Sequence, residues 1–113
     1  MAKTTKRRKG VWLAYDLGVD GDYEALYHWL DSHDAVECGD NAAFVRLEGG
    51  DDFVEALREE LKRVVRLRPR DRMYAIYPSA EGRYKGKFLI GSRKRAPWEG
   101  YAGQQEAGED EPV

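Results

Sequence analysis

Lysines and arginines are concentrated in the second half of the chain, and their side chains are the groups of this sequence best suited to bind phosphate. Residues 61–98 contain 12 basic residues and only two acidic ones. A dense surface of one sign attracts polyanions and releases counterions when it binds them. Tyr74, Tyr84 and Trp98 are interleaved with these cations and are candidates for stacking against bases. The basic residues are Lys62, Arg63, Arg66, Arg68, Arg70, Arg72, Arg83, Lys85, Lys87, Arg93, Lys94 and Arg95, and the ten from Arg66 onward are the candidate nucleic-acid contacts.

The first half of the sequence has the opposite charge. Residues 11–60 contain 14 acidic residues, and their only basic residues are Arg46 and Arg58. The two halves can therefore pair with each other, either within the fold or across a dimer interface, and this is the alternative to phosphate binding. Exposed ion pairs contribute only about 0–1 kcal/mol each, which is a weak reason for so complete a segregation.

Three carboxylates lie at the end of the first apolar run, residues 11–16 (VWLAYD), and in the loop that follows it. Asp16 closes this run, and its side chain can cap the following loop by accepting hydrogen bonds from the amides of Gly18 or Val19. Asp22 stands where a helix is expected to begin and can cap its first turn, while Asp20 lies between them. The loop is thus a candidate site whose ordinary explanation is local capping.

Composition predicts one soluble globular domain. The chain has 113 residues, of which 42% are hydrophobic and 35% charged, so a second independent core would be hard to fit. Cys38 is the only cysteine, which excludes an intrachain disulfide and a cysteine-based zinc site. No stretch has the apolar character of a secretory signal or a membrane span, so we expect a cytoplasmic protein without a membrane partner.

The periodicity of apolar residues predicts the element order βαββαβ. Strands are expected at residues 11–16 and 72–77, and a hairpin is expected around the turn at residues 39–41. One helix should run from Asp22 to about His33. A second should run to about Arg66, with Asp52 and Glu55 at the spacing of a capping box. Residues 86–91 (GKFLIG) are expected to form a short fifth strand outside this unit.

This order predicts an α+β fold of ferredoxin-like type. Right-handed crossovers put both helices on one face of the sheet, so the other face stays open to be covered by the fifth strand or by another copy of the chain. We expect a basic disordered arm at residues 1–10, a single domain at residues 11–98 and an acidic disordered tail at residues 99–113.

The pattern also resembles a known family. A strand ending Tyr15-Asp16, a hairpin strand with residues 41–44 (NAAF) and a strand with residues 74–78 (YAIYP) resemble the small CRISPR-associated endonucleases of the spacer-acquisition complex. The likeness extends to virulence-associated protein D and SinR-like proteins and covers about residues 11–91. It rests on element order more than on any single motif.

The resemblance implies a homodimer in which the last strand of each protomer extends or crosses onto the partner's sheet. It also implies that Asp16 faces its symmetry mate and holds Mg²⁺ for phosphodiester hydrolysis, a role that suits a hard carboxylate oxygen. The leading hypothesis is a dimeric protein associated with DNA or RNA, with Asp16 as catalytic residue and metal ligand. The alternative is a non-enzymatic protein-interaction or antitoxin-like module whose acidic and basic faces dock to each other or to a charged protein partner.

Overall fold

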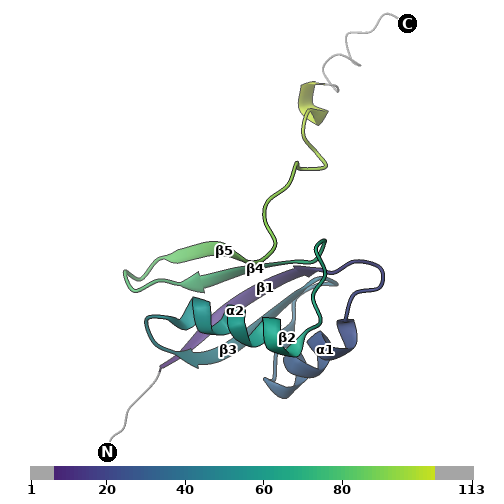
Figure 1. Ribbon diagram of the computed structural model, residues 1–113. Helices are drawn as coiled ribbons and strands as arrows, with labels where there is room; N and C mark the ends of the chain where they lie inside the picture. Colours follow the sequence, from purple (N-terminus) through teal and green to yellow (C-terminus); the bar gives the residue numbers. More distant parts are fainter. Residues whose placement is uncertain (1–6, 104–113) are drawn as a thin grey trace, which may run out of the picture.

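The chain folds as an α+β unit built on one five-stranded antiparallel sheet. The structure, a computed structural model, describes residues 7–103. Its elements are β1 (Arg7–Asp16), α1 (Tyr23–Ser32), β2 (Val36–Glu37), β3 (Ala42–Gly49), α2 (Phe53–Val64), β4 (Arg72–Pro78) and β5 (Tyr84–Ile90) (Figure 1). The sheet order is β2-β3-β1-β4-β5, and every neighbouring pair is antiparallel. The predicted order βαββαβ, followed by a fifth strand, is confirmed.

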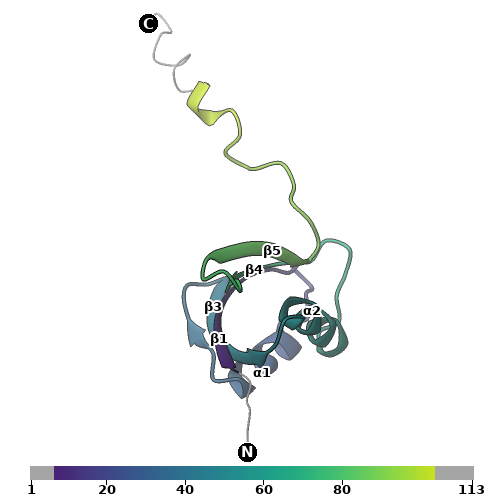
Figure 2. The same cartoon turned by 90° about the vertical axis from the view of Figure 1, so that its left-hand side faces the viewer.

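The core fills the space between the sheet and the two helices. Figure 2 shows both helices on one face of the sheet, which curls around them. Alternate residues of β1, β3 and β4 point to this side, as the pleat of a strand requires. The fully buried core is formed by Val11, Leu13, Val45 and Met73 from the strands and by Leu26 and Leu61 from the helices. The opposite face of the sheet carries no helix in the described part of the chain.

The fifth strand does not cover the open face. It pairs with β4 of its own chain and lengthens the sheet by one strand, with an irregularity in register between Met73 and Tyr74. Arg58 of α2 explains this position, because its guanidinium donates to the carbonyls of Phe88 (3.0 Å) and Leu89 (2.8 Å). The strand is thus attached to both its neighbouring strand and the helix layer.

Strand β1 is longer than predicted. It begins at Arg7 and pairs with β3 as far as Gly49, so residues 7–10 belong to the sheet and not to a disordered arm. The charged side chains at this end conceal the strand pattern. Residues 1–6 of the expected arm and residues 104–113 of the expected tail lie outside the described residues.

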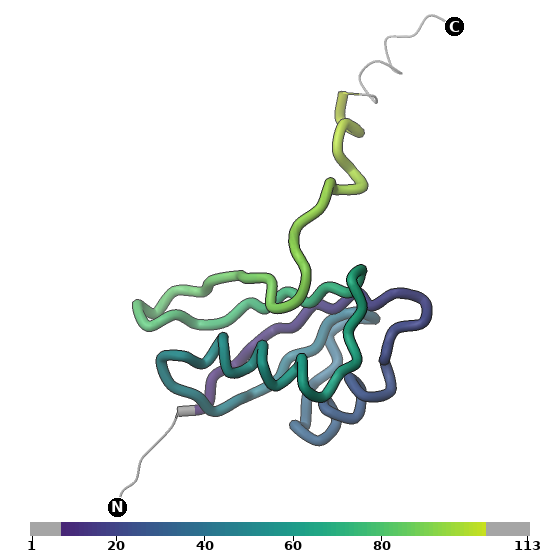
Figure 3. Tube along the Cα trace, viewed as in Figure 1, coloured from purple at the N-terminus to yellow at the C-terminus, as the bar shows by residue number. Residues whose placement is uncertain are grey.

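The two helix starts differ from each other. Asp22 caps α1 as predicted, because its Oδ1 accepts from the amide of Ala25 at 3.3 Å. The capping box predicted for α2 is wrong, since Asp52 makes no side-chain cap hydrogen bond and Glu55 pairs with Arg58 instead. After β5 the chain leaves the domain as an extension, residues 91–103, which Figure 3 shows pointing away from the sheet.

Candidate functional site

The open face, which we define as the sheet surface opposite the helices, carries a row of apolar side chains. Strand register places Val36, Phe44, Trp12, Ile76 and Gly86 side by side, one from each strand. Trp12 and Ile76 are 39% and 40% exposed, although they lie at the centre of the sheet. Contiguous exposed apolar side chains are typical of a surface that contacts a ligand or another protein.

Aromatic rings pack together within this row and beside it. The ring centroids of Trp12 and Phe44 lie 4.7 Å apart, and those of Trp12 and Tyr84 lie 5.7 Å apart. Glycine makes room for the rings, since a Cβ at Gly10 would lie 2.5 Å from Cζ of Phe44. Tyr84, at 63% exposure, belongs to this surface.

Three arginines lie over the aromatic rings of the open face. The guanidinium of Arg46 is 5.4 Å from the centroid of Phe44, and that of Arg72 is 5.8 Å from Phe88. Arg93, the third residue after β5, lies 5.9 Å from the ring of Tyr74 and 5.4 Å from that of Phe88. These are cation–π distances, so the same surface combines stacking groups with positive charge.

A hollow in the open face lies at the end of β1. This Asp16 pocket has a volume of about 510 Å³ and is lined by Ala14, Tyr15, Asp16, Asn41, Arg72, Tyr74 and Phe88. Tyr74 and Phe88 are register partners whose rings meet edge to face at 4.9 Å. Burial is the main cause that raises the pKa of Tyr15, and the neighbouring Tyr27 and Tyr23 raise it further.

Asp16 contacts Arg72 and does not cap the loop that follows it. Its Oδ2 lies 3.5 Å from a terminal nitrogen of Arg72, its register partner on β4. Nε of Arg72 is buried without a hydrogen-bond partner in the described part of the chain. The loop is held by Asp71 instead, whose Oδ1 accepts from the amide of Gly18 at 3.0 Å. The predicted capping role of Asp16 is therefore wrong.

The donor set of one chain does not fit the magnesium ion that the family resemblance implies. Asp16 is the only carboxylate among the residues lining its pocket, and the guanidinium of Arg72 already lies against it. Mg²⁺ requires near-octahedral oxygen coordination and is usually bound through one or two carboxylates together with waters and substrate phosphates. Within residues 7–103, no group of three or more His, Cys, Asp or Glu side chains is arranged to hold a metal ion.

The ten candidate nucleic-acid contacts divide into paired and unpaired cations. Arg68 lies 3.8 Å from Asp20, Arg72 is paired with Asp16, Lys87 lies 3.9 Å from Glu55, and Arg95 lies 3.4 Å from Glu99. Within the described residues, the side chains of Arg66, Arg70, Arg83, Lys85, Arg93 and Lys94 have no carboxylate partner inside 4.0 Å. The acidic half thus neutralises part of the basic half and leaves the rest available.

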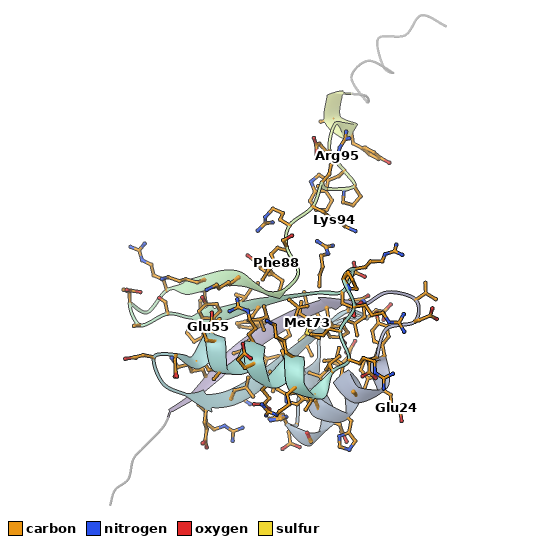
Figure 4. All side chains as sticks on the ribbon, viewed as in Figure 1. Glu24, Glu55, Met73, Phe88, Lys94 and Arg95 are labelled. Atoms are coloured by element: carbon orange, nitrogen blue, oxygen red, sulfur yellow. The ribbon has the colours of Figure 1, made fainter. Side chains whose placement is uncertain are left out.

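The six unpaired cations lie at two ends of the molecule. Arg66 and Arg70 stand on the connection between α2 and β4, which meets the sheet at the Asp16 end, and Arg93 and Lys94 follow β5 at that same end. Figure 4 shows Lys94 and Arg95 on the extension, beyond the body of the domain, while Glu24 of α1 lies on the far side. Arg83 and Lys85 occupy the turn and first residues of β5, at the other end.

Sequence reasoning found part of this surface and missed its centre. Of the three aromatic residues proposed to stack, Tyr74 and Tyr84 are on the open face, whereas Trp98 is on the extension. Trp12 and Phe44 were not among these three residues, because alternation shows that a strand has two faces but not which face stays uncovered. Their shared register on neighbouring strands is the signal that would have identified the row.

No protein-family model, no curated protein and no solved structure matches this chain. No helix within residues 7–103 has the length and apolar character needed to cross a membrane.

Proposed function

We propose that the protein is a ferredoxin-like sandwich, extended by one strand, that binds single-stranded nucleic acid on its open face. The observation that carries this proposal is the row of exposed aromatic rings with arginines lying over them. Unpaired bases stack on such rings, and each stacked base contributes about 1–3 kcal/mol by alanine substitution. Four-stranded sheets of RNA-binding domains stack two or three unpaired bases on exposed aromatic rings in this way.

Phosphates would contact the cations for which the described part of the chain offers no carboxylate partner. Arg93 and Lys94 adjoin the Asp16 end of the aromatic surface, and Arg83, in the turn before β5, lies at its other end. A strand whose bases lie on Trp12 and Tyr74 has cations at both ends of its path. The acidic residues of α1 belong to the opposite layer, so they do not repel a strand bound on the open face.

Fluorescence anisotropy with three labelled probes tests this proposal: a single-stranded RNA, a single-stranded DNA and a duplex of the same sequence. Trp12→Ala should weaken single-strand binding about tenfold, a loss within the range for one stacked base. Tyr27→Ala is the matched control, since Tyr27 is an exposed aromatic residue of α1 on the helix side. Equal affinity for the duplex, or no effect of Trp12→Ala, would contradict the proposal.

A second candidate function rests on the same apolar row. Val36, Ile76 and Tyr84 are all exposed, and two copies of the chain, or a protein partner, could bury them face to face. Trp12→Glu should then convert a dimer into a monomer in light scattering, because it places a charge at the centre of the contact. A wild-type protein that is monomeric at high concentration would remove the homodimer.

A metal-dependent nuclease would also require that dimer, because a second copy is what would add a second Asp16 carboxylate. Cleavage of RNA or DNA in the presence of Mg²⁺ that disappears in Asp16→Ala would support this role. Cleavage that persists in Asp16→Ala would remove Asp16 as its catalytic residue.

A further inference from the structure

We infer that the Asp16 pocket binds one guanine base of the single strand and so gives the protein a base preference. The inference rests on the proposed function and adds its specificity. The pocket lies on the open face next to the aromatic row. Its lining residues Ala14 and Tyr74 are register partners, and they lie two residues along their strands from the paired Trp12 and Ile76. A base that leaves the row at this end can enter it.

The walls of the pocket suit a planar ring. Tyr74 and Phe88 form an aromatic side, and Arg93 lies 5.9 Å from the ring of Tyr74, so a base can lie against an aromatic face or a guanidinium plane. Ala14 contributes only a methyl group to the floor. The volume of about 510 Å³ is in the range of roughly 300–1,000 Å³ usual for small-molecule sites.

Polar groups fix which base edge fits. The carboxylate oxygens of Asp16 accept hydrogen bonds, whereas the Arg72 guanidinium beside them, 3.5 Å away, only donates them. Nδ2 of Asn41 donates to the carbonyl of Tyr15 at 3.1 Å, which holds that side chain at the pocket wall. The pocket therefore presents an acceptor next to a donor, both from rigid strands.

Guanine is the base whose Watson–Crick edge matches this pair. Its N1–H and N2 amino groups are two adjacent donors for the carboxylate of Asp16, and its O6 is an acceptor for Arg72. Adenine and cytosine each offer one donor group to a carboxylate, and uracil offers one donor between two acceptors. The edge is free only in an unpaired base, so the same contacts exclude a duplex.

The test compares five short RNA probes that differ only at the central base, measured in EDTA. The probes are UUGUU, UUAUU, UUCUU, UUUUU and UUIUU, where I is inosine, which lacks the N2 amino group. The guanine probe should bind about tenfold more tightly than the uracil probe, a ratio within that of one good bidentate base contact. Inosine should lose a large part of this preference. A control probe in addition to these five, with 7-deazaguanine at its centre, is altered only on the Hoogsteen edge and should keep the preference.

Asp16→Asn is the decisive variant, because it replaces one acceptor oxygen with a donor amide at a side chain that is 64% exposed. The guanine preference, which is the ratio of the affinities for UUGUU and UUUUU, should fall at least fivefold in this variant, while the melting temperature stays close to that of the wild type. A preference that is unchanged in Asp16→Asn, or that appears only when Mg²⁺ is added, overturns the inference. Equal, tight binding of all five probes overturns it too but leaves the proposed function intact, whereas failure of every probe to bind removes both.

Discussion

Asp71 is the buried carboxylate that holds the Asp16 end of the sheet together. Asp71 is 1% exposed, and its two carboxylate oxygens accept hydrogen bonds from the backbone amides of Gly18 (3.0 Å) and Arg68 (2.8 Å). Each bond joins a loop to the start of β4. The amides come from segments far apart in the sequence, which is why a reading of local spacing assigned the capping role to Asp16 instead.

We expect Asp71→Ala to lower the free energy of unfolding by about 3 kcal/mol, because it leaves two amides without their charged acceptor. Asp71→Asn should lose about half as much, since its single carbonyl oxygen can still accept from one amide. Urea denaturation followed by circular dichroism measures both values. Equal losses in the two variants would show that the hydrogen bond that Asp71→Asn retains contributes nothing to stability.

Asp22 links the beginning of α1 to the end of α2. Its pKa is lowered chiefly because the amide of Arg66 donates to its Oδ2 at 2.9 Å, with further contributions from the amide of Ala25 and the charges of Arg66 and Arg68. A lowered pKa in the folded state means that the ionised form stabilises the fold. This stabilisation is complete above the unfolded pKa of 3.8 and is lost as the pH falls through the folded value.

The melting temperature of Asp22→Ala should therefore be several degrees below that of the wild type at pH 7, and the difference should shrink below about pH 4. Asp52→Ala is the matched control at the start of α2, where no side-chain cap bond is present. Its melting temperature should stay close to that of the wild type. Thermal denaturation from pH 3 to pH 7 measures both, and a difference for Asp22→Ala that persists at pH 3 would contradict the assigned cause.

At the scale of elements, the sequence predicted which segments are strands and helices better than where they begin or what they cover. Alternation in β3, with Val45 inward and Phe44 outward, was readable because one face is strongly apolar. The start of β1 was missed because Arg7 to Lys9 are charged and gain their strand conformation only by pairing with β3. Long-range pairing of this kind leaves no local pattern.

The position of β5 depends on a contact that local sequence does not show. Arg58 is mostly buried, donates to two carbonyls of β5 and is itself paired with Glu55, whose pKa is lowered chiefly by that hydrogen bond. It stands in α2 as an ordinary charged residue of an amphipathic helix. Only the fold reveals that it attaches β5, and with it Phe88 of the Asp16 pocket, to the helix layer.

Arg58→Met should thus loosen β5 before the rest of the sheet. We expect a loss of about 2 kcal/mol in unfolding free energy, because two hydrogen bonds from a charged donor disappear while the aliphatic stem is kept. Hydrogen exchange of the amides of residues 84–90 should accelerate more than that of β1. Glu55→Gln is the control, since it weakens the pairing with Arg58 but leaves both carbonyl contacts in place. Uniform acceleration across the sheet would show that Arg58 supports the whole core and not β5.

At the scale of the molecule, acidic and basic residues lie mostly in different parts of the fold, although the net charge is only -2. The acidic helix α1 lies on one face of the sheet, whereas Lys94 and Arg95 lie on the extension, beyond the body of the domain (Figure 4). Where the two halves meet, Asp16 and Asp20 neutralise Arg72 and Arg68. The number of cations that remain sets how strongly the binding of a polyanion must depend on salt.

That number gives a quantitative prediction for single-stranded nucleic acid. Each phosphate contact contributes a slope of about -0.7 to a plot of log affinity against log salt, so three to six contacts give roughly -2 to -4. Participation of all ten candidate cations would give about -7. The observed ion pairs favour the smaller range, which corresponds to a loss of roughly one to two orders of magnitude in affinity between 50 and 200 mM salt.

The double variant Arg93→Ala, Lys94→Ala should reduce the magnitude of the slope by about 1.4, because it removes two cations at the edge of the open face that have no carboxylate partner within residues 7–103. Lys62→Ala, Arg63→Ala is its matched control: these two residues lie in the last turn of α2, in the helix layer, and carry the same charge. Their loss lowers the net charge equally but removes no contact on the open face. Equal changes in the two double variants would mean that binding senses total charge alone, and the open face would then have no special role in holding the strand.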